Sequence, residues 1–164
     1  MSTTMSSLLR EMIIYMPQGL TLGANRFFEP SKKFLNYMSA QFGNTLVYDV
    51  GAGDGYTAKR LNDLGVTTRA IDLSYRDGQK YPVEIANAVD YEYLSHSCVM
   101  FCRPCHGPWV ECAIDQALSR GVTTFLYIGF RKNLRDDLGA YTKRFHNVLR
   151  MAGRDRESVW MMTK

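Results

Sequence analysis

The chain contains 164 residues, of which 46% are hydrophobic and 22% are charged, and its formal net charge is +4. These values are ordinary for a globular protein and exclude a collagen, a coiled coil and a wholly disordered chain. The length is typical of one domain, so we expect a single domain over residues 1–164. No apolar run approaches the roughly 20 residues that a membrane span needs, and we identify no export signal. We therefore expect a cytoplasmic protein that does not contact a membrane.

The positive charge is concentrated near the C-terminus. Residues 131–164 hold nine Lys or Arg and four Asp or Glu, a local charge of +5, so the remaining chain carries −1. A basic segment of this kind leaves nucleic acid open as a partner. No aromatic stacking platform accompanies Arg131, Lys132 and Arg135 in the sequence, however, and we expect these residues to solvate the start of a helix.

Strands and helices are predicted to alternate along most of the chain. Two helices are expected within residues 1–43, the second of them beginning at Ser31 and ending near Gly43. Beyond them, short β-branched apolar runs predict strands at 45–50, 66–71, 83–88, 97–102, 123–130 and 158–162. Helical periodicity predicts helices at 58–64 and 108–121, and a long helix from 131 to 153 on Leu134, Leu138, Tyr141, Phe145 and Leu149.

This alternation predicts an α/β fold, with a doubly wound and mostly parallel sheet of about six strands and helices on both faces. We divide the domain into N-terminal helices (1–43), a ligand-binding core (44–130) and a basic C-terminal helix and strand (131–164). Only one strand is expected after the long helix. Such a short sheet would leave an edge that a second copy of the chain could pair with, so a homo-oligomer is left open.

The most informative stretch is Val47-Tyr-Asp-Val-Gly-Ala-Gly-Asp-Gly55, between a predicted strand and a predicted helix. Ligands of doubly wound sheets bind at the carboxyl ends of such strands. A dinucleotide fingerprint would need its third glycine where Tyr56 stands, and Asp54 would repel a pyrophosphate. No Gly-Lys-Ser/Thr follows the loop, so a P-loop is excluded.

A cationic nucleoside suits an acidic loop better, and here the sequence resembles the class I S-adenosylmethionine-dependent methyltransferases. Their first motif is an apolar strand, an acidic residue and a G-x-G-x-G loop, as in VYDVGAGDG. The resemblance covers roughly residues 45–130 and implies S-adenosylmethionine as the cofactor. It implies an acidic residue on the ribose hydroxyls, a polar residue near the adenine and a contact after the fourth strand. The residues matched to these roles are Asp49, Gly51, Ala52, Gly53, Asp54, Gly55, Asp72, Leu73, Asp90, Tyr91 and Cys102.

The fourth motif departs from the family pattern. Enzymes of this family that methylate amino groups of nucleic acids carry [DNS]-P-P-[YFW], whereas this chain has Cys102-Arg-Pro-Cys-His106. This segment has no carboxylate or amide that could accept a hydrogen bond from an amino group. It also has no aromatic ring that could stack on a base. The catalytic residues therefore stay unknown, with Cys105, His106 and Lys132 as weak candidates.

Two other versions of the family match in part. Pro104-Cys105 resembles the Pro-Cys of cytosine carbon-5 methyltransferases, but that family's other catalytic residues are missing. Lys32 or Lys33, Lys132 and Glu157 resemble the set of ribose 2′-O-methyltransferases, although Cys102 stands where that set needs an aspartate.

The cysteines offer a second kind of site. Cys98, Cys102, Cys105 and Cys112 lie within fifteen residues, beside His106, and include a C-x₂-C pair that zinc could use. Cys98 falls in an apolar strand and Cys112 beside Trp109 on a predicted helix, so we expect both to be buried in the core. We expect no metal.

The sequence therefore predicts a methyltransferase of unknown acceptor. One alternative is a non-catalytic methyltransferase-like module that binds S-adenosylmethionine or serves in assembly, because the fourth motif is atypical. A second alternative is an RNA methyltransferase, which the basic C-terminal segment would suit.

Overall fold

A computed structural model of the chain describes residues 30–74, 81–105, 107–139, 143, 145, 147–154 and 157–164. These residues form a seven-stranded sheet in the order β3-β2-β1-β4-β5-β7-β6. The strands are β1 (Val47–Val50), β2 (Thr68–Asp72), β3 (Glu84–Ile85), β4 (Cys98–Cys102), β5 (Thr124–Phe130), β6 (Asn147–Arg154) and β7 (Glu157–Thr163). The helices are α2 (Lys32–Phe42), α3 (Tyr56–Asp63), α4 (Trp109–Ser119) and α5 (Arg131–Leu138). The predicted α/β fold with a mostly parallel sheet is confirmed.

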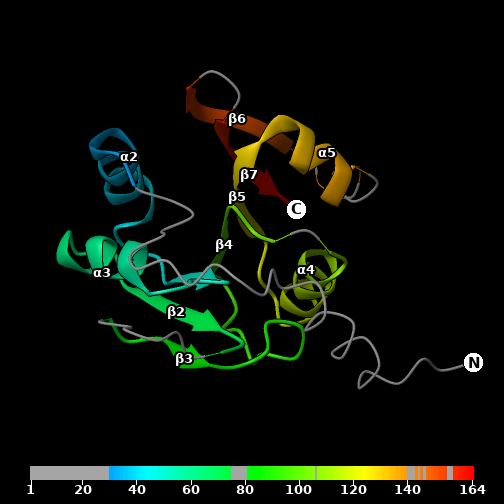
Figure 1. Cartoon of the computed structure of the whole chain (residues 1–164), viewed down its shortest axis with the longest axis horizontal. Coiled ribbons are helices and arrows are strands. Elements are labelled where there is room, and N and C mark those ends of the chain that lie inside the picture. Colours follow the sequence, from blue (N-terminus) through cyan, green and yellow to red (C-terminus); the bar gives the residue numbers. More distant parts are fainter. Residues whose placement is uncertain are drawn as a thin grey trace, which may run out of the picture.

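Helices cover both faces of the sheet, with α2 and α3 on one side and α4 and α5 on the other (Figure 1). One core cluster joins α2 and α3 to the sheet through Met38, Leu61, Met100 and others. The other cluster joins α4 and α5 to the opposite face through Ala113, Phe101 and others. The apolar stripe on each helix therefore faces the sheet, as the periodicity predicts.

Local signals fix the helix that leads into the sheet. Ser31 accepts a hydrogen bond of 3.1 Å from the main-chain N–H of Phe34, which caps α2 as expected. The helix ends before Gly43, and β1 begins four residues later.

The parallel strands place their carboxyl ends at one edge of the sheet. In the registers, Val50 of β1 pairs with Ile71 of β2, and Cys102 of β4 pairs with Ile128 of β5. Strand order reverses between β1 and β4, since the chain adds β2 and β3 on one side and β4 and β5 on the other. Ligands of open α/β sheets bind outside the carboxyl ends at such a point.

The C-terminal part of the chain corrects one prediction. The helix expected from 131 to 153 stops at Leu138, and Asn147–Arg154 forms β6, which pairs with β7 as an antiparallel hairpin. The sheet thus has seven strands, one more than expected. Gly139 follows the helix, and glycine is a poor helix former. Pairing with β6 also covers an edge of β7 that would otherwise expose its backbone groups.

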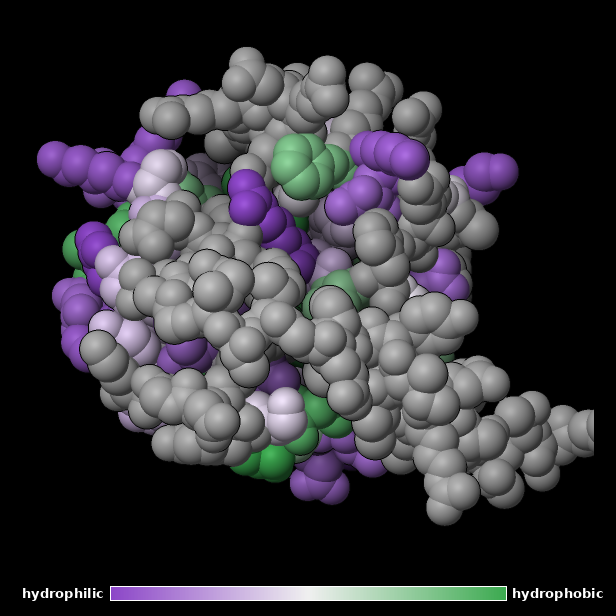
Figure 2. Space-filling view, in the orientation of Figure 1, coloured by the Kyte–Doolittle hydropathy of each residue, from purple (hydrophilic) through white to green (hydrophobic). Residues whose placement is uncertain are grey.

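On the face shown in Figure 2, the visible coloured residues include both hydrophilic side chains and smaller hydrophobic spots. Within the described part of the chain, none of the helices has the length and apolar character needed to cross a membrane. The helix predicted at the start of the chain lies outside the described residues.

Candidate functional site

The glycine loop connects β1 to α3 at the carboxyl edge. Gly51, Gly53 and Gly55 all have left-handed backbone conformations, with φ angles of 73°, 64° and 79°. Residues with a Cβ adopt this region at a cost, which explains why the loop needs glycine. The main-chain N–H groups of Gly51 and Ala52 donate to the carbonyl oxygen of Ile71 over 2.8 and 3.0 Å. The end of β2 therefore holds the start of the loop.

Three carboxylates gather around this loop, and two of them bind its backbone. Oδ2 of Asp72 accepts a hydrogen bond of 2.7 Å from the N–H of Gly53. Oδ1 of Asp54 accepts one of 3.0 Å from the N–H of Tyr56, at the first turn of α3. A carboxylate there suits the unpaired N–H groups at a helix N-terminus.

The third carboxylate, Asp49, is nearly inaccessible to solvent, with 1% exposed, and its Oδ1 has no hydrogen-bond partner. Burial, followed by the neighbouring charges of Asp72 and Asp54, raises the pKa of Asp49 to about 7. A buried acceptor without a donor is uncommon and calls for an explanation. A cationic ligand held at this loop would supply one.

The segment expected to approach the adenine follows the short strand β3. β3 ends at Ile85, and the N–H of Ala86 donates to the carbonyl of Asp72 over 3.0 Å. Asn87 comes next, and its Oδ1 accepts from the N–H of Val89. Asn87 was not among the predicted site residues, although a polar residue two positions beyond a short strand is a recognisable signal.

Asp90 and Tyr91 follow on the irregular segment that returns to β4. Asp90 is exposed, and the hydroxyl of Tyr91 donates to Glu84 over 2.8 Å. Burial and the acceptor Glu84 raise the pKa of Tyr91 to about 12. Tyr91 also packs edge-on against Tyr48, with ring centroids 5.5 Å apart. Leu73 follows Asp72 and is half-buried.

The atypical fourth motif meets the glycine loop through an aromatic ring. Cys102 ends β4 and is half-buried, whereas Cys105 is exposed. The indole N–H of Trp109 donates to the carbonyl of Cys105 over 2.9 Å. The far end of the same indole lies so near Gly51 that a Cβ there would be 3.3 Å from Cη2. Trp109 thus joins the segment after β4 to the loop after β1, a contact that the sequence analysis did not predict.

The remaining candidates are only partly brought together. Lys132 is exposed on α5, directly beyond β5, and His106 lies outside the described residues. Cys98 is buried as expected, and burial strongly raises the pKa of its thiol. Cys112 is exposed, which corrects the prediction of a buried side chain, because it lies on the outer side of α4. No metal-binding group of His, Cys, Asp and Glu is found among the residues that the structure describes.

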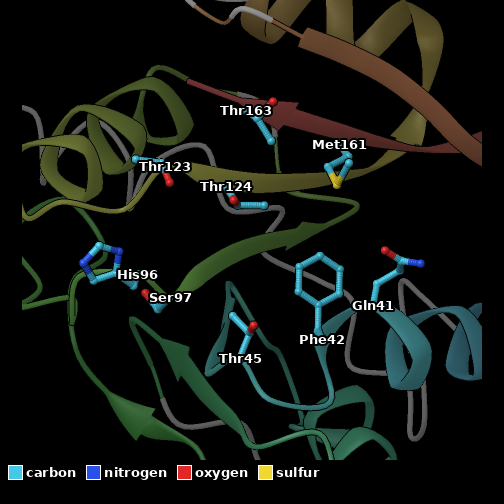
Figure 3. Close-up of a pocket in the computed structure, with 9 residues that line it drawn as sticks. All are labelled: Gln41, Phe42, Thr45, His96, Ser97, Thr123, Thr124, Met161 and Thr163. Atoms are coloured by element: carbon cyan, nitrogen blue, oxygen red, sulfur yellow. The ribbon is translucent and has the colours of Figure 1, made fainter.

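A separate hollow of about 340 Å³ opens at the opposite edge of the sheet. Figure 3 shows its lining side chains, among them His96, Ser97, Thr123 and Thr124, where β4 and β5 begin. The hydroxyl of Ser97 already donates to the carbonyl of Leu94 over 2.7 Å. This hollow is distinct from the carboxyl edge that holds the glycine loop.

Comparison with solved structures identifies the fold. The match to the T. thermophilus 16S rRNA N2 G1207 methyltransferase RsmC, in complex with AdoMet and guanosine, has a TM-score of 0.60 at 16% identity. It covers 87% of this chain and 45% of RsmC, so this chain spans under half of that protein. The chain has the class I methyltransferase fold.

Two other matches support this class I methyltransferase fold. An S-adenosylmethionine-dependent methyltransferase from Bacteroides fragilis, in complex with S-adenosyl-L-homocysteine, matches with a TM-score of 0.56 at 16% identity, over 84% of this chain and 78% of that one. A Thermoplasma acidophilum protein matches with a TM-score of 0.57 at 18% identity, over 77% of this chain and 83% of that one. No protein-family model and no curated protein matches the sequence.

Proposed function

We propose that this chain is an S-adenosylmethionine-dependent methyltransferase that binds its cofactor at the glycine loop. The observation that carries the proposal is the buried carboxylate of Asp49, whose Oδ1 has no hydrogen-bond partner. It stands beside Asp54 and Asp72 at the point where the strand order reverses. This charge disfavours a pyrophosphate and favours a ligand that carries a sulfonium and an ammonium group.

The residues present fit such a ligand. The Asp72 carboxylate accepts one strong hydrogen bond from the loop and keeps acceptor positions for the two ribose hydroxyls. Asn87 follows β3 closely enough to meet the adenine, and we place it ahead of Asp90 in that role. The left-handed glycines Gly51 and Gly53 let main-chain groups approach the ligand.

When bound, S-adenosylmethionine would supply an electrophilic methyl group on its sulfonium, and transfer of that methyl to an acceptor nucleophile would leave S-adenosylhomocysteine and a proton. The chain's contribution is to orient both partners. Near-attack geometry alone can be worth roughly 7–11 kcal/mol, so a dedicated base is not required. Trp109 and the segment from Cys102 to Cys105 border the loop on the side of β4, where the acceptor would enter.

Titration calorimetry with S-adenosylmethionine tests the cofactor, and NAD serves as the comparison ligand. We expect binding of S-adenosylmethionine and S-adenosylhomocysteine and no binding of NAD. Absence of S-adenosylmethionine binding at every reachable concentration would contradict the proposal. Transfer of a labelled methyl group then separates an enzyme from a non-catalytic module that binds the same cofactor.

A further inference from the structure

An aromatic ring and an arginine stand together where β4 and β5 end. Phe130 is the last residue of β5, two positions beyond Ile128, which pairs with Cys102 in the register of the two strands. Arg103 is the first residue after β4, and its main-chain N–H donates to the carbonyl of Ile128 over 2.8 Å. Both residues therefore lie at the carboxyl edge, Arg103 in the segment that follows β4 and Phe130 at the end of the neighbouring strand β5.

Phe130 and Arg103 are both exposed and lie close together. Phe130 is 41% exposed, whereas the residues from Phe125 to Gly129 on the same strand are buried. The guanidinium carbon of Arg103 lies 5.7 Å from the centroid of the ring, within the range of a cation–π contact. Arginine stacks on planar groups in a way that lysine does not.

The backbone of Arg103 adds a second observation. Its φ angle is +46°, in the left-handed region that residues with a Cβ rarely adopt. Such conformations persist where their surroundings enforce them, and they cluster at functional sites. Here the strained residue is the one that carries the guanidinium to the exposed ring.

Charge divides the carboxyl edge into two halves. Asp49, Asp54 and Asp72 make the half at β1 and β2 acidic. The other half carries Arg103 and the exposed Lys132 on the first turn of α5, together with Glu157, which pairs with Phe130 in the register of β5 and β7. The acidic half suits the cationic cofactor, and the two cations near Phe130 suit an anionic acceptor.

From these features we infer that the acceptor is a base of single-stranded nucleic acid, stacked on Phe130 and Arg103, with a phosphate near Lys132. This inference rests on the proposed methyltransferase function, because it names the acceptor of that site. Aromatic stacking recognises every base through its face, and basic side chains neutralise the backbone. The structure thus provides the platform that could not be found in the sequence around the fourth motif.

Fluorescence anisotropy with a short labelled single-stranded RNA tests the inference, with an abasic ribose-phosphate oligomer of equal length as the comparison probe. We expect the parent protein to prefer the base-bearing RNA. Phe130→Leu should weaken the binding of that RNA by roughly ten-fold or more and leave the binding of the abasic oligomer unchanged. Leu94→Ala is the matched control, because Leu94 is 54% exposed but precedes β4 at the opposite edge.

Variants of the basic residues separate stacking from charge. Arg103→Lys keeps the charge but removes the planar guanidinium. It should therefore weaken the binding of the RNA and leave the binding of the abasic oligomer unchanged. Lys132→Ala should reduce the slope of log affinity against log salt by roughly 0.7–0.9 for either probe. Lys164→Ala, beyond the end of β7 at the amino edge, should leave the slope unchanged.

Three results would overturn the inference: equal affinity for the two probes, full RNA affinity in Phe130→Leu, or no RNA binding at physiological salt. Calorimetry with S-adenosylmethionine on the same samples shows whether each variant is folded and competent for the cofactor. Cofactor binding without RNA binding rejects the nucleic-acid acceptor alone. RNA binding without cofactor binding rejects the proposed methyltransferase.

Discussion

The main-chain N–H of Gly53 donates a hydrogen bond of 2.7 Å to Oδ2 of Asp72, so the end of β2 holds the centre of the glycine loop. The same carboxylate is 5% exposed, and it is the acid that the class I resemblance matches to the ribose hydroxyls. One side chain thus shapes the loop and stands ready to bind the ligand. Its substitution should affect both.

Asp72→Ala is expected to weaken the binding of S-adenosylmethionine by roughly 1.5–3 kcal/mol for each charged hydrogen bond lost. Titration calorimetry on the parent and the variant measures this loss. Asp72→Asn keeps an acceptor for Gly53 and should lose less affinity than Asp72→Ala. Asp63→Ala is the control, because Asp63 is exposed on α3 and pairs with Lys59. Equal affinities across the series would reject the role of Asp72.

Local patterns were sufficient to predict the centre of the fold. β1, the glycine loop and α3 follow one another within seventeen residues, and their signals depend on neighbours in the chain. The same holds for Ser31 as the cap of α2 and for Pro108 before α4. Asp49, Asp54 and Asp72 could be predicted as site residues because they belong to this local frame.

Long-range contacts were not predictable in this way. Leu138 and Phe145 fit a helical spacing and are both buried, but Phe145 follows the helix and lies just before β6. The spacing was therefore a coincidence that only the pairing of β6 with β7 reveals. Trp109 was assigned to a helix correctly, yet its contact with Gly51 joins two loops far apart in the sequence. Asn87 was missed because β3 is short and gives a weak pattern.

Trp109 should report ligand binding through its fluorescence. Its indole packs against Gly51 and donates to the carbonyl of Cys105, so a ligand at the loop changes its surroundings. Adding S-adenosylmethionine is expected to change the intrinsic emission, and Trp109→Phe should remove most of that change. Trp160→Phe is the control, since Trp160 lies on β7. A change that persists in Trp109→Phe and disappears in Trp160→Phe would contradict the geometry.

Gly55→Ala should destabilise the fold more than Gly65→Ala. Both glycines have left-handed φ angles, 79° and 82°, so both variants carry the strain of roughly 1–2 kcal/mol. A Cβ on Gly55 would lie 2.8 Å from Cγ2 of Val83 and 3.2 Å from the carbonyl oxygen of Pro82, whereas Gly65 has nothing within 4 Å. Overpacking should add roughly 1–3 kcal/mol to the loss in Gly55→Ala. Urea unfolding measures both, and equal losses would show that the segment before β3 does not press on the loop.

The buried carboxylate of Asp49 should make cofactor binding depend on pH. Its pKa is raised to about 7, first by burial and then by the charges of Asp72 and Asp54, so near neutral pH it is partly protonated. A cationic ligand favours the ionised form, and binding should therefore release a proton from Asp49. At pH values near 6.5 the amine of the ligand is already protonated, since an α-amino group has a pKa of about 8. Calorimetry in two buffers of different ionisation enthalpy measures the release, which Asp49→Asn should abolish.

The same shift fixes the direction of the stability change in the absence of ligand. An unfolded aspartate ionises at its ordinary pKa of 3.8, so between there and about pH 7 the folded chain binds more protons through Asp49 than the unfolded chain does. The free energy of unfolding should consequently fall as the pH rises through this window. Asp49→Asn removes the titrating group, and above pH 7 it should be more stable than the parent by roughly 1–3 kcal/mol, because an unpaired buried group no longer carries charge. Near pH 4 the difference should disappear, since the parent is then protonated as well. Urea unfolding from pH 4 to pH 8 tests this, and a parent that gains stability relative to Asp49→Asn on going to pH 8 would mean that Asp49 has a partner for its charge.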